Sequence, residues 1–379
     1  MRLARTDTSP LSQWWWTVDR VSLAAMGLLF AAGVLLAFAA GPAAAGRIGQ
    51  NLSDFHFVKR QVMFLGPAVG LSFAVSLLSP LYVRRLAVLV FGGSLVAMGL
   101  TLMIGPEIKG AQRWLYFGGV SLQPSEFAKP AFIVVTAWMF AEQIRDPKFP
   151  GRIIAVLFYL VIAGLLIKQP DYGQWVLTTA AWASVFFIAG VSWPWIVALG
   201  GFVIAASLGA YILAPHVASR VDAFLNPATE GFSQTDIALK AIARGGVSGR
   251  GPGEGDVKHA LPDAHTDFIF AVAGEEFGLI ACLLLVSLFA IIVLRAYARA
   301  FSDKSPFVQL AASGLAALIG LQALINMAVN LRLMPAKGMT LPLVSYGGSS
   351  MLATALALGM LLALTRERPH TWRRKEAMV

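Results

Sequence analysis

The segment between Pro262 and Gly278 concentrates acidic residues at the start of an apolar stretch. It reads PDAHTDFIFAVAGEEFG, with Asp267 where a polar loop meets an apolar helix and with Glu275 and Glu276 inside that helix. If the helix begins near Asp267, a rise of about 1.5 Å per residue puts the two glutamates roughly 12 Å deeper. Carboxylates in or beside a bilayer cost free energy, so we interpret these residues as functional.

A histidine among these acids raises the question of a metal site. His265 stands two residues before Asp267, a spacing that does not share one helix face. A structural zinc site takes four ligands, so we predict no protein-held metal here. A divalent cation, Mg²⁺ or Mn²⁺, held loosely between Asp267 and a substrate phosphate stays open as an alternative.

A second group of chemically active residues lies between Gly110 and Lys129, in the segment GAQRWLYFGGVSLQPSEFAK. Arg113 sits in a glycine-rich loop, and Pro124 can begin a helix because proline costs little in the first turn. Glu126 and Lys129, three apart on that helix, can neutralise each other. They form either a buried ion pair between helices or, through Lys129, a cationic contact for a phosphate-bearing substrate.

Two further connections combine turn residues with charge. Residues 168–174, KQPDYGQ, form a short turn in which Asp171 could cap the next helix or take a catalytic or cation-binding role. Residues 334–350, MPAKGMTLPLVSYGGSS, have the prolines and glycines typical of a broken helix entry. The glycines favour close helix packing, and in the alternative Lys337 or Ser345 contacts substrate.

Residues 215–265 form a long segment that includes Arg220. Within it, residues 234–244 have the helical spacing of apolar side chains that suits a membrane surface. The run GGVSGRGPGEG, residues 245–255, is not a Walker loop, because it lacks GK[ST] and no strand precedes it. This excludes nucleotide binding. The run is either a mobile backbone that wraps an anionic ligand with Arg250 or a plain flexible loop.

The elements that must hold these residues are apolar helices. The chain is 57% hydrophobic and 13% charged, with mean hydropathy +0.70. We therefore predict an all-α polytopic integral membrane protein, one membrane domain over residues 1–379 with about ten transmembrane helices, since each apolar run can cross about 30 Å of hydrocarbon. A large extracytoplasmic loop, 215–265, separates the seventh and eighth. The expected spans are 21–40, 61–79, 86–104, 124–142, 153–168, 174–190, 194–214, 266–294, 306–328 and 341–364.

The distribution of basic residues predicts the orientation of the chain. With both termini on one side, that side holds sixteen of the thirty Lys and Arg residues, the opposite short connections hold nine, and the long loop holds five. Long segments say little about orientation, so the short connections decide. We predict that residues 1–20 and the basic tail 365–379 are cytoplasmic, that loop 215–265 is periplasmic, and that every motif above lies at the periplasmic mouth of the bundle.

Charge and cysteine content exclude other classes of protein. The net charge of +10 reports membrane topology first, and no nucleic-acid-binding motif accompanies it. Cys282 is the single cysteine, so neither an intramolecular disulfide nor a CxxC motif is available.

Six segments, in this order, resemble the SEDS family (shape, elongation, division and sporulation) of bacterial membrane glycosyltransferases. They are GA-RW, QPSE-K, QPD-G, the stretch from Arg220 to Pro227, PDAHTDFIFAVAGEEFG and LPLVSYGGSS. PAKGMTLPLVSYGGSS is more similar to the division member than to the elongation member, whose segment before LPF-SYGG tends to be more apolar. One departure is visible, because the family's PEAHTD has Asp263 here in place of the glutamate.

The resemblance implies a peptidoglycan glycosyltransferase that polymerises lipid II, an undecaprenyl-pyrophosphate disaccharide-pentapeptide, at the periplasmic face of the inner membrane during septal wall synthesis. Asp267 matches the family's essential aspartate and is the expected general base. The expected substrate contacts, four of them cations for the pyrophosphate, are Arg113, Lys129, Arg220, Lys337 and Ser345. The residues expected to support the site are Glu126, Asp171, His265, Glu275 and Glu276.

The resemblance also implies protein partners. They are a class B penicillin-binding protein, which is a transpeptidase with a single span, and other divisome membrane proteins. Three alternatives stay open: a lipid II flippase, which intramembrane polar residues such as Glu126 would suit, an elongation-type polymerase, and a scaffold that recruits divisome proteins. No cofactor is expected apart from the divalent cation considered above.

Overall fold

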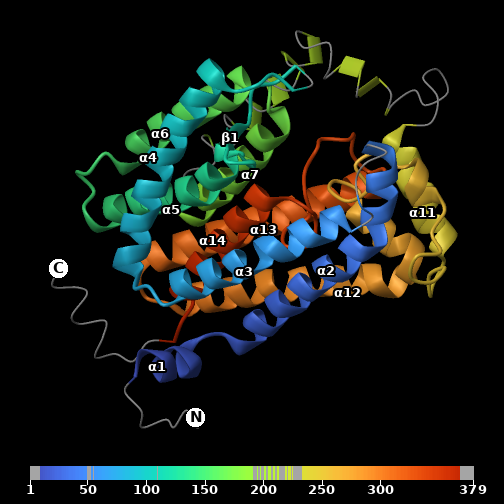
Figure 1. Cartoon of the computed structure of the whole chain (residues 1–379). Coiled ribbons are helices and arrows are strands. Elements are labelled where there is room, and N and C mark those ends of the chain that lie inside the picture. Colours follow the sequence, from blue (N-terminus) through green and yellow to red (C-terminus); the bar gives the residue numbers. More distant parts are fainter. Residues whose placement is uncertain are drawn as a thin grey trace.

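Helices make up most of the computed structural model, which describes residues 9–48, 53, 55–108, 110–190, scattered positions between 194 and 224, and 233–367. A two-stranded antiparallel hairpin and a 3-10 helix lie in the connections. Figure 1 shows α2, α3, α12 and α14 side by side, with α4 to α7 next to them. The elements are α1 (Pro10–Thr17), α2 (Arg20–Ile48), α3 (His56–Ser76), α4 (Pro80–Ile104), β1 (Leu115–Phe117), β2 (Val120–Leu122), α5 (Pro124–Arg145), α6 (Gly151–Lys168), α7 (Tyr172–Ile188), α11 (Gln234–Gly245), η1 (Val257–Ala260), α12 (Ile269–Ser302), α13 (Pro306–Asn330) and α14 (Gly348–Leu364).

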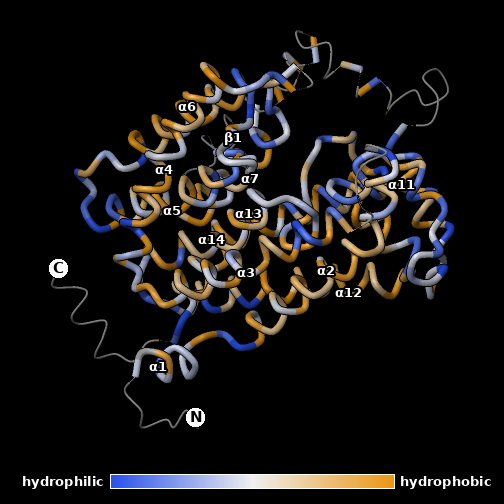
Figure 2. Tube along the Cα trace, in the orientation of Figure 1, coloured by the Kyte–Doolittle hydropathy of each residue, from blue (hydrophilic) through white to orange (hydrophobic). Residues whose placement is uncertain are grey.

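The apolar helices confirm the predicted membrane class. Among the described residues, α2, α4, α6, α12 and α13 are long and apolar enough to cross a bilayer, and α14 is a shorter apolar helix. Met103 and Leu89 are 81% and 74% exposed, which suits a surface that faces lipid. Figure 2 shows apolar residues along the helices and polar residues in the connections and around α11. The count of ten spans stays a prediction, because the seventh, 194–214, falls mostly outside the described residues.

The core lies among α5, α13 and α14, whose side chains are buried on nearly every face. α5 packs against α4, α6 and α13, and α14 packs against α3. A small residue permits close approach at Gly314 of α13, where an added Cβ would lie within 2.6 Å of the Val185 and Ile133 side chains. These packed helices give the connections at their ends a rigid base.

Two helices begin later than the apolar pattern predicts. α12 begins at Ile269 rather than at residue 266, because residues 262–268 form consecutive turns. α14 begins at Gly348 rather than at residue 341, because residues 342–346 also form turns and bends. By contrast, Pro124 does begin α5, as its low cost in the first turn predicts. Asp267 therefore lies in the turn just before α12.

α12 is interrupted at Gly278, where φ is 75° and ψ is −169°. Residues 246–251 of the preceding loop insert at this break, and four backbone hydrogen bonds of 3.0–3.3 Å join them to residues 275–280. The inserted loop thereby satisfies backbone groups that a broken helix would otherwise leave unpaired. Glycine is required, because a Cβ on Gly278 would lie 2.3 Å from the carbonyl oxygen of Val247.

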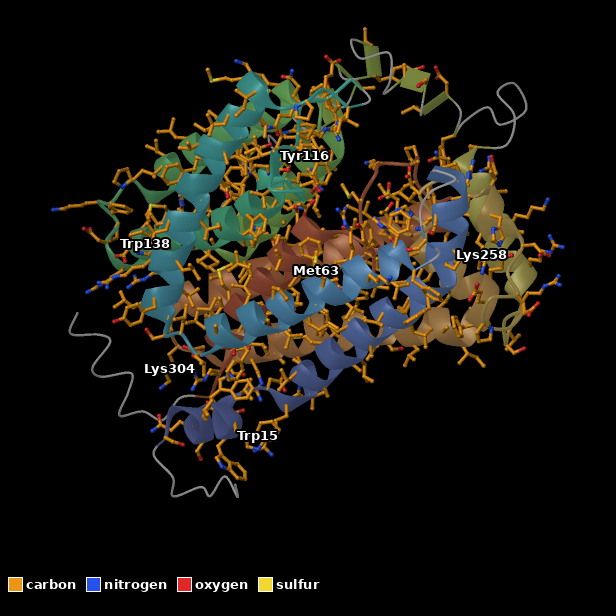
Figure 3. The ribbon with its side chains drawn as sticks, in the orientation of Figure 1. Trp15, Met63, Tyr116, Trp138, Lys258 and Lys304 are labelled. Carbon is orange, nitrogen blue, oxygen red and sulfur yellow. The ribbon has the colours of Figure 1, made fainter. Side chains whose placement is uncertain are left out.

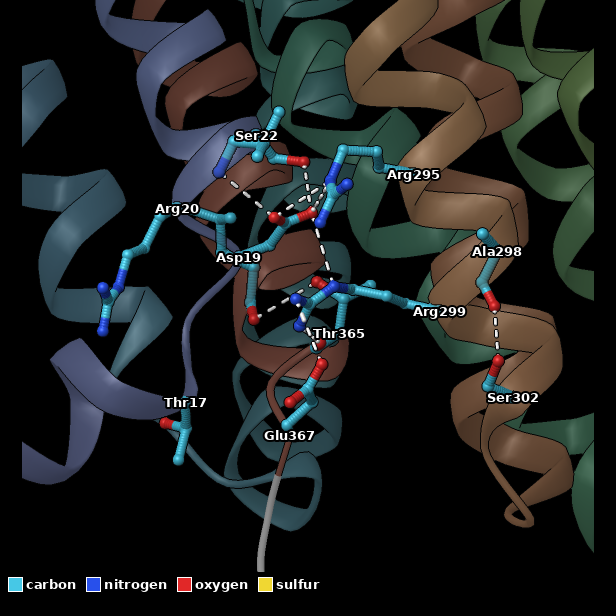
Figure 4. Close-up of polar contacts among 12 residues, drawn as sticks. Thr17, Asp19, Arg20, Ser22, Arg295, Ala298, Arg299, Ser302, Thr365 and Glu367 are labelled. Carbon is cyan, nitrogen blue, oxygen red and sulfur yellow. Dashed lines mark hydrogen bonds and ion pairs between the residues drawn. The ribbon is translucent and has the colours of Figure 1, made fainter.

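A charged cluster ties α12 to other segments at the end of the bundle where α1 lies (Figure 4). Asp19 is 2% exposed and accepts hydrogen bonds from Arg295 and from Ser22, each at 2.8 Å. Arg299 lies 3.4 Å from Asp19 and donates to the carbonyl of Thr365 at 3.0 Å. The C-terminal part of α12 is thus joined to the residue before α2 and to the residue after α14. We call these residues the Asp19 cluster.

Candidate active site

A cavity of about 700 Å³ lies near the other end of α12. Its walls come from α3, the connection before α5, the start of α11, the turn before α12, the second half of α13 and the connection before α14. Met63, which Figure 3 labels on α3, belongs to one wall. Polar and aromatic side chains in the lining include Arg60, Phe64, Arg113, Trp114, Gln123, Glu126, Gln174, Gln234, Asp263, Asp267, Asn326, Lys337, Thr340, Tyr346 and Ser349.

Asp267 lines this cavity from the turn before α12, and its side chain is half-buried. Its carboxylate faces Gly338, since a Cβ added to that glycine would lie 3.6 Å from Oδ2 of Asp267. Lys337, next to that glycine, lines the same cavity. The structure therefore brings the predicted base and one predicted cation together from segments seventy residues apart in the sequence.

The backbone around Asp267 is held at three consecutive carbonyls. The amide of Tyr346 donates to the carbonyl of His265 at 3.0 Å, and the hydroxyl of Ser345 donates to that of Thr266 at 2.5 Å. The carbonyl of Asp267 itself accepts from two side-chain amides of α13, at 2.8 and 3.0 Å. The backbone that carries the carboxylate is thus held by α13 and by the connection to α14.

Asp263 explains how this turn closes and why a short acid fits there. Its φ is 54°, in the left-handed region that Asp tolerates better than most residues. Its carbonyl accepts the amides of Thr266, Asp267 and Phe268 at 3.0, 3.1 and 3.4 Å. An aspartate at this position is therefore compatible with the backbone that carries Asp267.

Arg113 lines the cavity and is anchored by the connection between α6 and α7. Its Nε donates to the carbonyl of Gln169 at 3.0 Å, its Nη2 donates to that of Pro170, and its Nη1 lies 3.5 Å from the Asp171 carboxylate. Asp171 in turn caps α7, because its Oδ1 accepts from the amide of Gln174 at 3.4 Å. Burial raises the pKa of Asp171, and the Arg113 charge opposes that rise. The capping alternative for Asp171 is confirmed.

Lys337 supplies a second cation in the cavity wall. It lies in the connection between α13 and α14, and its backbone packs against Gly173, where an added Cβ would lie 3.1 Å from the Lys337 carbonyl oxygen. Burial lowers the pKa of Lys337 below its ordinary value of 10.5, because a desolvated ammonium is less stable than the neutral amine. An anionic ligand in the cavity would reverse that penalty.

Lys129 lies behind the cavity wall rather than in it. Its side chain is 2% exposed, its Nζ lies 3.0 Å from the Glu126 carboxylate, and it also donates to Gln174. Glu126 and Gln174 do line the cavity, so they stand between Lys129 and any ligand. Of the two interpretations drawn from the sequence, the geometry favours the buried ion pair over direct contact with a phosphate.

Ser345 likewise binds the protein backbone and does not face the cavity. It is 4% exposed and is absent from the cavity lining, and its hydroxyl accepts the amide of Leu341 at 2.7 Å while it donates to the carbonyl of Thr266.

His265 is buried between the rings of Phe57 and Tyr346, with centroids 4.4 and 5.4 Å away. Burial lowers the pKa of His265, which favours a neutral ring that packs rather than a cation. Ser345 and His265 therefore both shape the turn that carries Asp267.

The interpretation of the glycine-rich run as a backbone that wraps a ligand needs correction. Residues 245–255 pack against α12, and Arg250, absent from the cavity lining, donates from Nε to the carbonyl of Arg244 at 3.2 Å. Glu275 and Glu276 also lie outside the lining; the Glu276 carboxylate accepts the amide of Gly253 in this loop, and the Glu275 carboxylate accepts that of Val257 in η1. Arg220 is one of the residues outside those that the structure describes.

No group of three or more His, Cys, Asp or Glu side chains that could hold a metal ion occurs among the described residues. Asp263 and Asp267 both line the cavity, but two carboxylates from the protein leave most ligands of a divalent cation to substrate or water. The described residues therefore fit only the loosely held cation, bound jointly by Asp267 and a phosphate.

Sequence reasoning missed the amides that organise the site. Asn326 and Asn330 bind the carbonyl of Asp267, and Gln174 bridges Glu126 and Lys129. The available signal was the presence of Asn326 and Asn330 one turn apart inside an apolar run. Polar residues in a membrane helix are costly and are expected to have a partner, so this spacing marked one face of α13.

Comparison with known proteins places this chain among bacterial membrane proteins. Residues 19–370 match a family profile described as cell cycle protein, which comprises FtsW, RodA and SpoVE. A relative from Caulobacter vibrioides, named "probable peptidoglycan glycosyltransferase FtsW", is 50% identical over 369 residues, which cover 97% of this chain and 94% of the relative. A relative of the same name from Trichlorobacter lovleyi is 35% identical, over 92% of this chain and 93% of its own.

Solved structures agree with the sequence comparison. A chain from a peptidoglycan synthase complex, described as coordinating polymerization and crosslinking, has a TM-score of 0.76 and 29% identity and covers 93% of this chain and 98% of its own. The crystal structure of the rod-shape-determining protein RodA from Thermus thermophilus has a TM-score of 0.68 and 27% identity. The match covers 94% of this chain and 99% of the RodA chain.

Proposed function

The chain belongs to the SEDS family of cell-cycle proteins that comprises FtsW, RodA and SpoVE, and on this premise we propose that it is a peptidoglycan glycosyltransferase of the FtsW type. Its substrate in this proposal is lipid II, and its product is a glycan strand. The division-type assignment is supported by relatives of that name at 50% and 35% identity.

The proposed reaction joins two lipid-linked sugars in the cavity. The 4-hydroxyl of the acceptor GlcNAc attacks the anomeric carbon of the donor MurNAc, the new glycosidic bond forms, and the bond to undecaprenyl pyrophosphate breaks. The proton of the attacking hydroxyl passes to the carboxylate of Asp267, which lines the cavity. The electron pair of the broken bond leaves on the pyrophosphate, whose charge needs cations close by.

Two cations of the cavity suit the leaving group. Arg113 is anchored by backbone carbonyls and by Asp171, so its guanidinium is already oriented for an anion. Lys337 sits next to the glycine that faces Asp267 and is held in a desolvated wall, where a negative charge would stabilise its protonated form. A divalent cation shared by Asp267 and the pyrophosphate would add to this neutralisation.

The observation that carries the proposal is the meeting of Asp267, Arg113 and Lys337 in one cavity of about 700 Å³. A lipid II flippase would need a polar route across the bundle. Further along α5 from Glu126, Phe132 is fully buried among the rings of Phe91, Tyr159 and Trp182, and Leu315 of α13 is fully buried as well. This packing, in the described part of the chain, favours chemistry at one end over transport from end to end.

The test is a lipid II polymerisation assay on the full chain with its transpeptidase partner, with and without Mg²⁺ or Mn²⁺. We expect the wild-type protein to make glycan strands. Asp267→Asn keeps the shape of the side chain but removes its charge, so it should lower the rate by 10² or more, within the range for a lost general base of about 10²–10⁴. Undiminished polymerisation by a folded Asp267→Asn protein would remove Asp267 as the base.

The remaining expectations form part of the same proposal. Residues 1–20 and 365–379 lie in the cytoplasm, loop 215–265 lies in the periplasm, and the whole chain acts as one membrane domain at the division septum. The partner is a class B penicillin-binding protein with a single span. α12 offers a lipid-facing row for such a helix, with Ile280, Leu284 and Leu294 at 62%, 57% and 67% exposure.

A further inference from the structure

Two asparagines of α13 share one acceptor in the turn that carries the proposed base. Asn326 and Asn330 stand one helical turn apart and are 1% and 0% exposed. Their side-chain amides both donate to the main-chain carbonyl of Asp267, at 2.8 and 3.0 Å. A carbonyl oxygen has two lone pairs and accepts up to two hydrogen bonds, so the two asparagines saturate the carbonyl of Asp267.

Each asparagine also binds a second segment. Asn326 donates to the carbonyl of Met339 at 2.6 Å, two residues beyond Lys337. Asn330 accepts the amide of Ala271, in the first turn of α12, at 3.0 Å. Asn326 therefore joins the turn of Asp267 to the connection that carries Lys337, and Asn330 joins that turn to the helix that follows it.

Packing alone does not require amides at these positions. α13 is buried on nearly every face among apolar side chains, where leucine or alanine would fill the same space without a polar group. A buried amide costs free energy unless it is bonded, so two adjacent amides aimed at one carbonyl indicate that the orientation of that carbonyl matters. The cavity reaches Asn326 as well, which places this contact at the wall of the site.

We propose that Asn326 and Asn330 are positioning residues for glycosyl transfer. By holding the backbone of Asp267 to α13 and to the Lys337 connection, they set the distance between the group that accepts the proton and the cation that meets the leaving pyrophosphate. The proposal rests on the function proposed above. Its consequence is kinetic, because a displacement of about 1 Å in a catalytic group can lower the rate about 10²-fold.

The experiment compares Asn326→Ala, Asn330→Ala and Asn326→Leu in the full chain reconstituted with its transpeptidase partner. The leucine variant refills the space, so it separates loss of the amide from loss of volume. We expect kcat for lipid II polymerisation to fall by about ten- to a hundredfold while KM changes by less than about threefold, since positioning acts on the reacting step. Tyr159→Phe is the matched control, because it removes one buried hydrogen bond of 2.8 Å between α6 and α7, to Thr179, and neither residue lines the cavity.

A second readout follows the backbone directly. Hydrogen exchange of the peptide covering residues 262–271 should quicken in Asn330→Ala, because the carbonyl of Asp267 loses one donor and the amide of Ala271 keeps only its 3.0 Å bond to the carbonyl of Phe268. It should stay unchanged in Tyr159→Phe. Increased exchange confined to this peptide, together with a lower kcat, supports a positioning role, because a general loss of stability would quicken exchange in other segments too.

Three outcomes would overturn this inference. The first is wild-type kcat in folded Asn326→Leu and Asn330→Ala proteins, and the second is a rise in KM with kcat unchanged. The third is a loss of activity in Tyr159→Phe as large as in the asparagine variants, which would indicate a general effect of stability. Asp267→Asn, assayed in parallel, keeps the two proposals apart. Full activity of Asp267→Asn would contradict the role of Asp267 as the base. An inactive Asp267→Asn protein beside fully active asparagine variants would contradict only the positioning role of Asn326 and Asn330.

Discussion

Lys258 of η1 and Glu276 of α12 form an ion pair whose side chains are 4% and 0% exposed. Glu276 also accepts the amide of Gly253 at 3.0 Å, and its neighbour Glu275 accepts the amides of Val257 and Lys258 at 2.7 and 2.9 Å. The two acids therefore hold the loop that leads to the Asp267 turn. Their carboxylates are satisfied by backbone amides and one cation, as buried charges must be.

Lys258→Met should destabilise the protein by about 3–5 kcal/mol, the usual cost of leaving one buried charge without its partner. Adding Glu276→Gln should restore much of the loss, since no charge is then left unpaired. Thermal unfolding in detergent measures both effects. Lys148→Met removes an exposed lysine and should leave the unfolding temperature unchanged. Equal stability of Lys258→Met and the wild type would show that the pair contributes nothing.

Gly278→Ala should disturb the insertion of the loop into α12. The left-handed φ of 75° is unfavourable for alanine, and its Cβ would meet the carbonyl oxygen of Val247 at 2.3 Å. Strain of this kind costs about 1–3 kcal/mol before the clash is counted. Gly27→Ala in α2 is the control, because no atom lies within 4 Å of its added Cβ. A normal unfolding temperature for Gly278→Ala would mean that the break in α12 is not needed.

Asp19→Asn should weaken the Asp19 cluster at all ordinary pH values. Burial raises the pKa of Asp19, but hydrogen bonds from Arg295 and Ser22 and the charge of Arg299 outweigh it, so the pKa lies below 3.8. A carboxylate whose pKa is lower in the folded chain than in the unfolded chain stabilises the fold at pH values above the unfolded-state pKa. This contribution disappears as pH falls through the folded-state pKa. The stability difference between the wild type and Asp19→Asn should therefore be constant from about pH 5 to pH 8 and shrink only in strong acid. A difference that vanishes already at pH 6 would contradict this.

The membrane class and the residues that meet in the cavity could be predicted from the sequence, because apolar runs and polar motifs are local signals. Asp267, Arg113 and Lys337 each stand in a polar connection next to an apolar helix. If these connections share one membrane face, the side chains must gather, and all three do line one cavity. The membrane face on which this cavity lies stays a prediction.

The exact roles of several charged residues could not be predicted, because they depend on partners far away in the sequence. Lys129 and Arg113 look alike as cations beside a helix start. Lys129 is enclosed by Glu126 and Gln174, whereas Arg113 faces the cavity. How α5 packs against α7 sets this difference. The glycine-rich run was misread for the same reason, because its binding site is a break in α12 that only the folded chain reveals.

Lys337 should give the proposed glycosyl transfer an alkaline limit. Burial lowers its pKa below 10.5, so part of the free enzyme loses this positive charge at a lower pH than an exposed lysine would. The logarithm of kcat/KM should therefore fall on the alkaline side at that lowered pKa. In the proposed complex with lipid II, the pyrophosphate would stabilise the ammonium, so the corresponding fall in kcat should lie at higher pH.

Lys337→Arg tests this assignment, because a guanidinium stays protonated throughout the accessible range. We expect Lys337→Arg to keep measurable activity and to lose the alkaline fall in kcat/KM, and Lys337→Ala to have low kcat/KM at every pH. The direction in which folding stability changes with pH does not depend on substrate. An unfolded chain binds its Lys337 proton up to about pH 10.5, so without ligand the wild type should gain stability over Lys337→Arg as pH rises through the folded pKa. An alkaline limb that persists unchanged in Lys337→Arg would assign it to another group and leave the arginines of the cavity lining, Arg60 and Arg113, to meet the pyrophosphate.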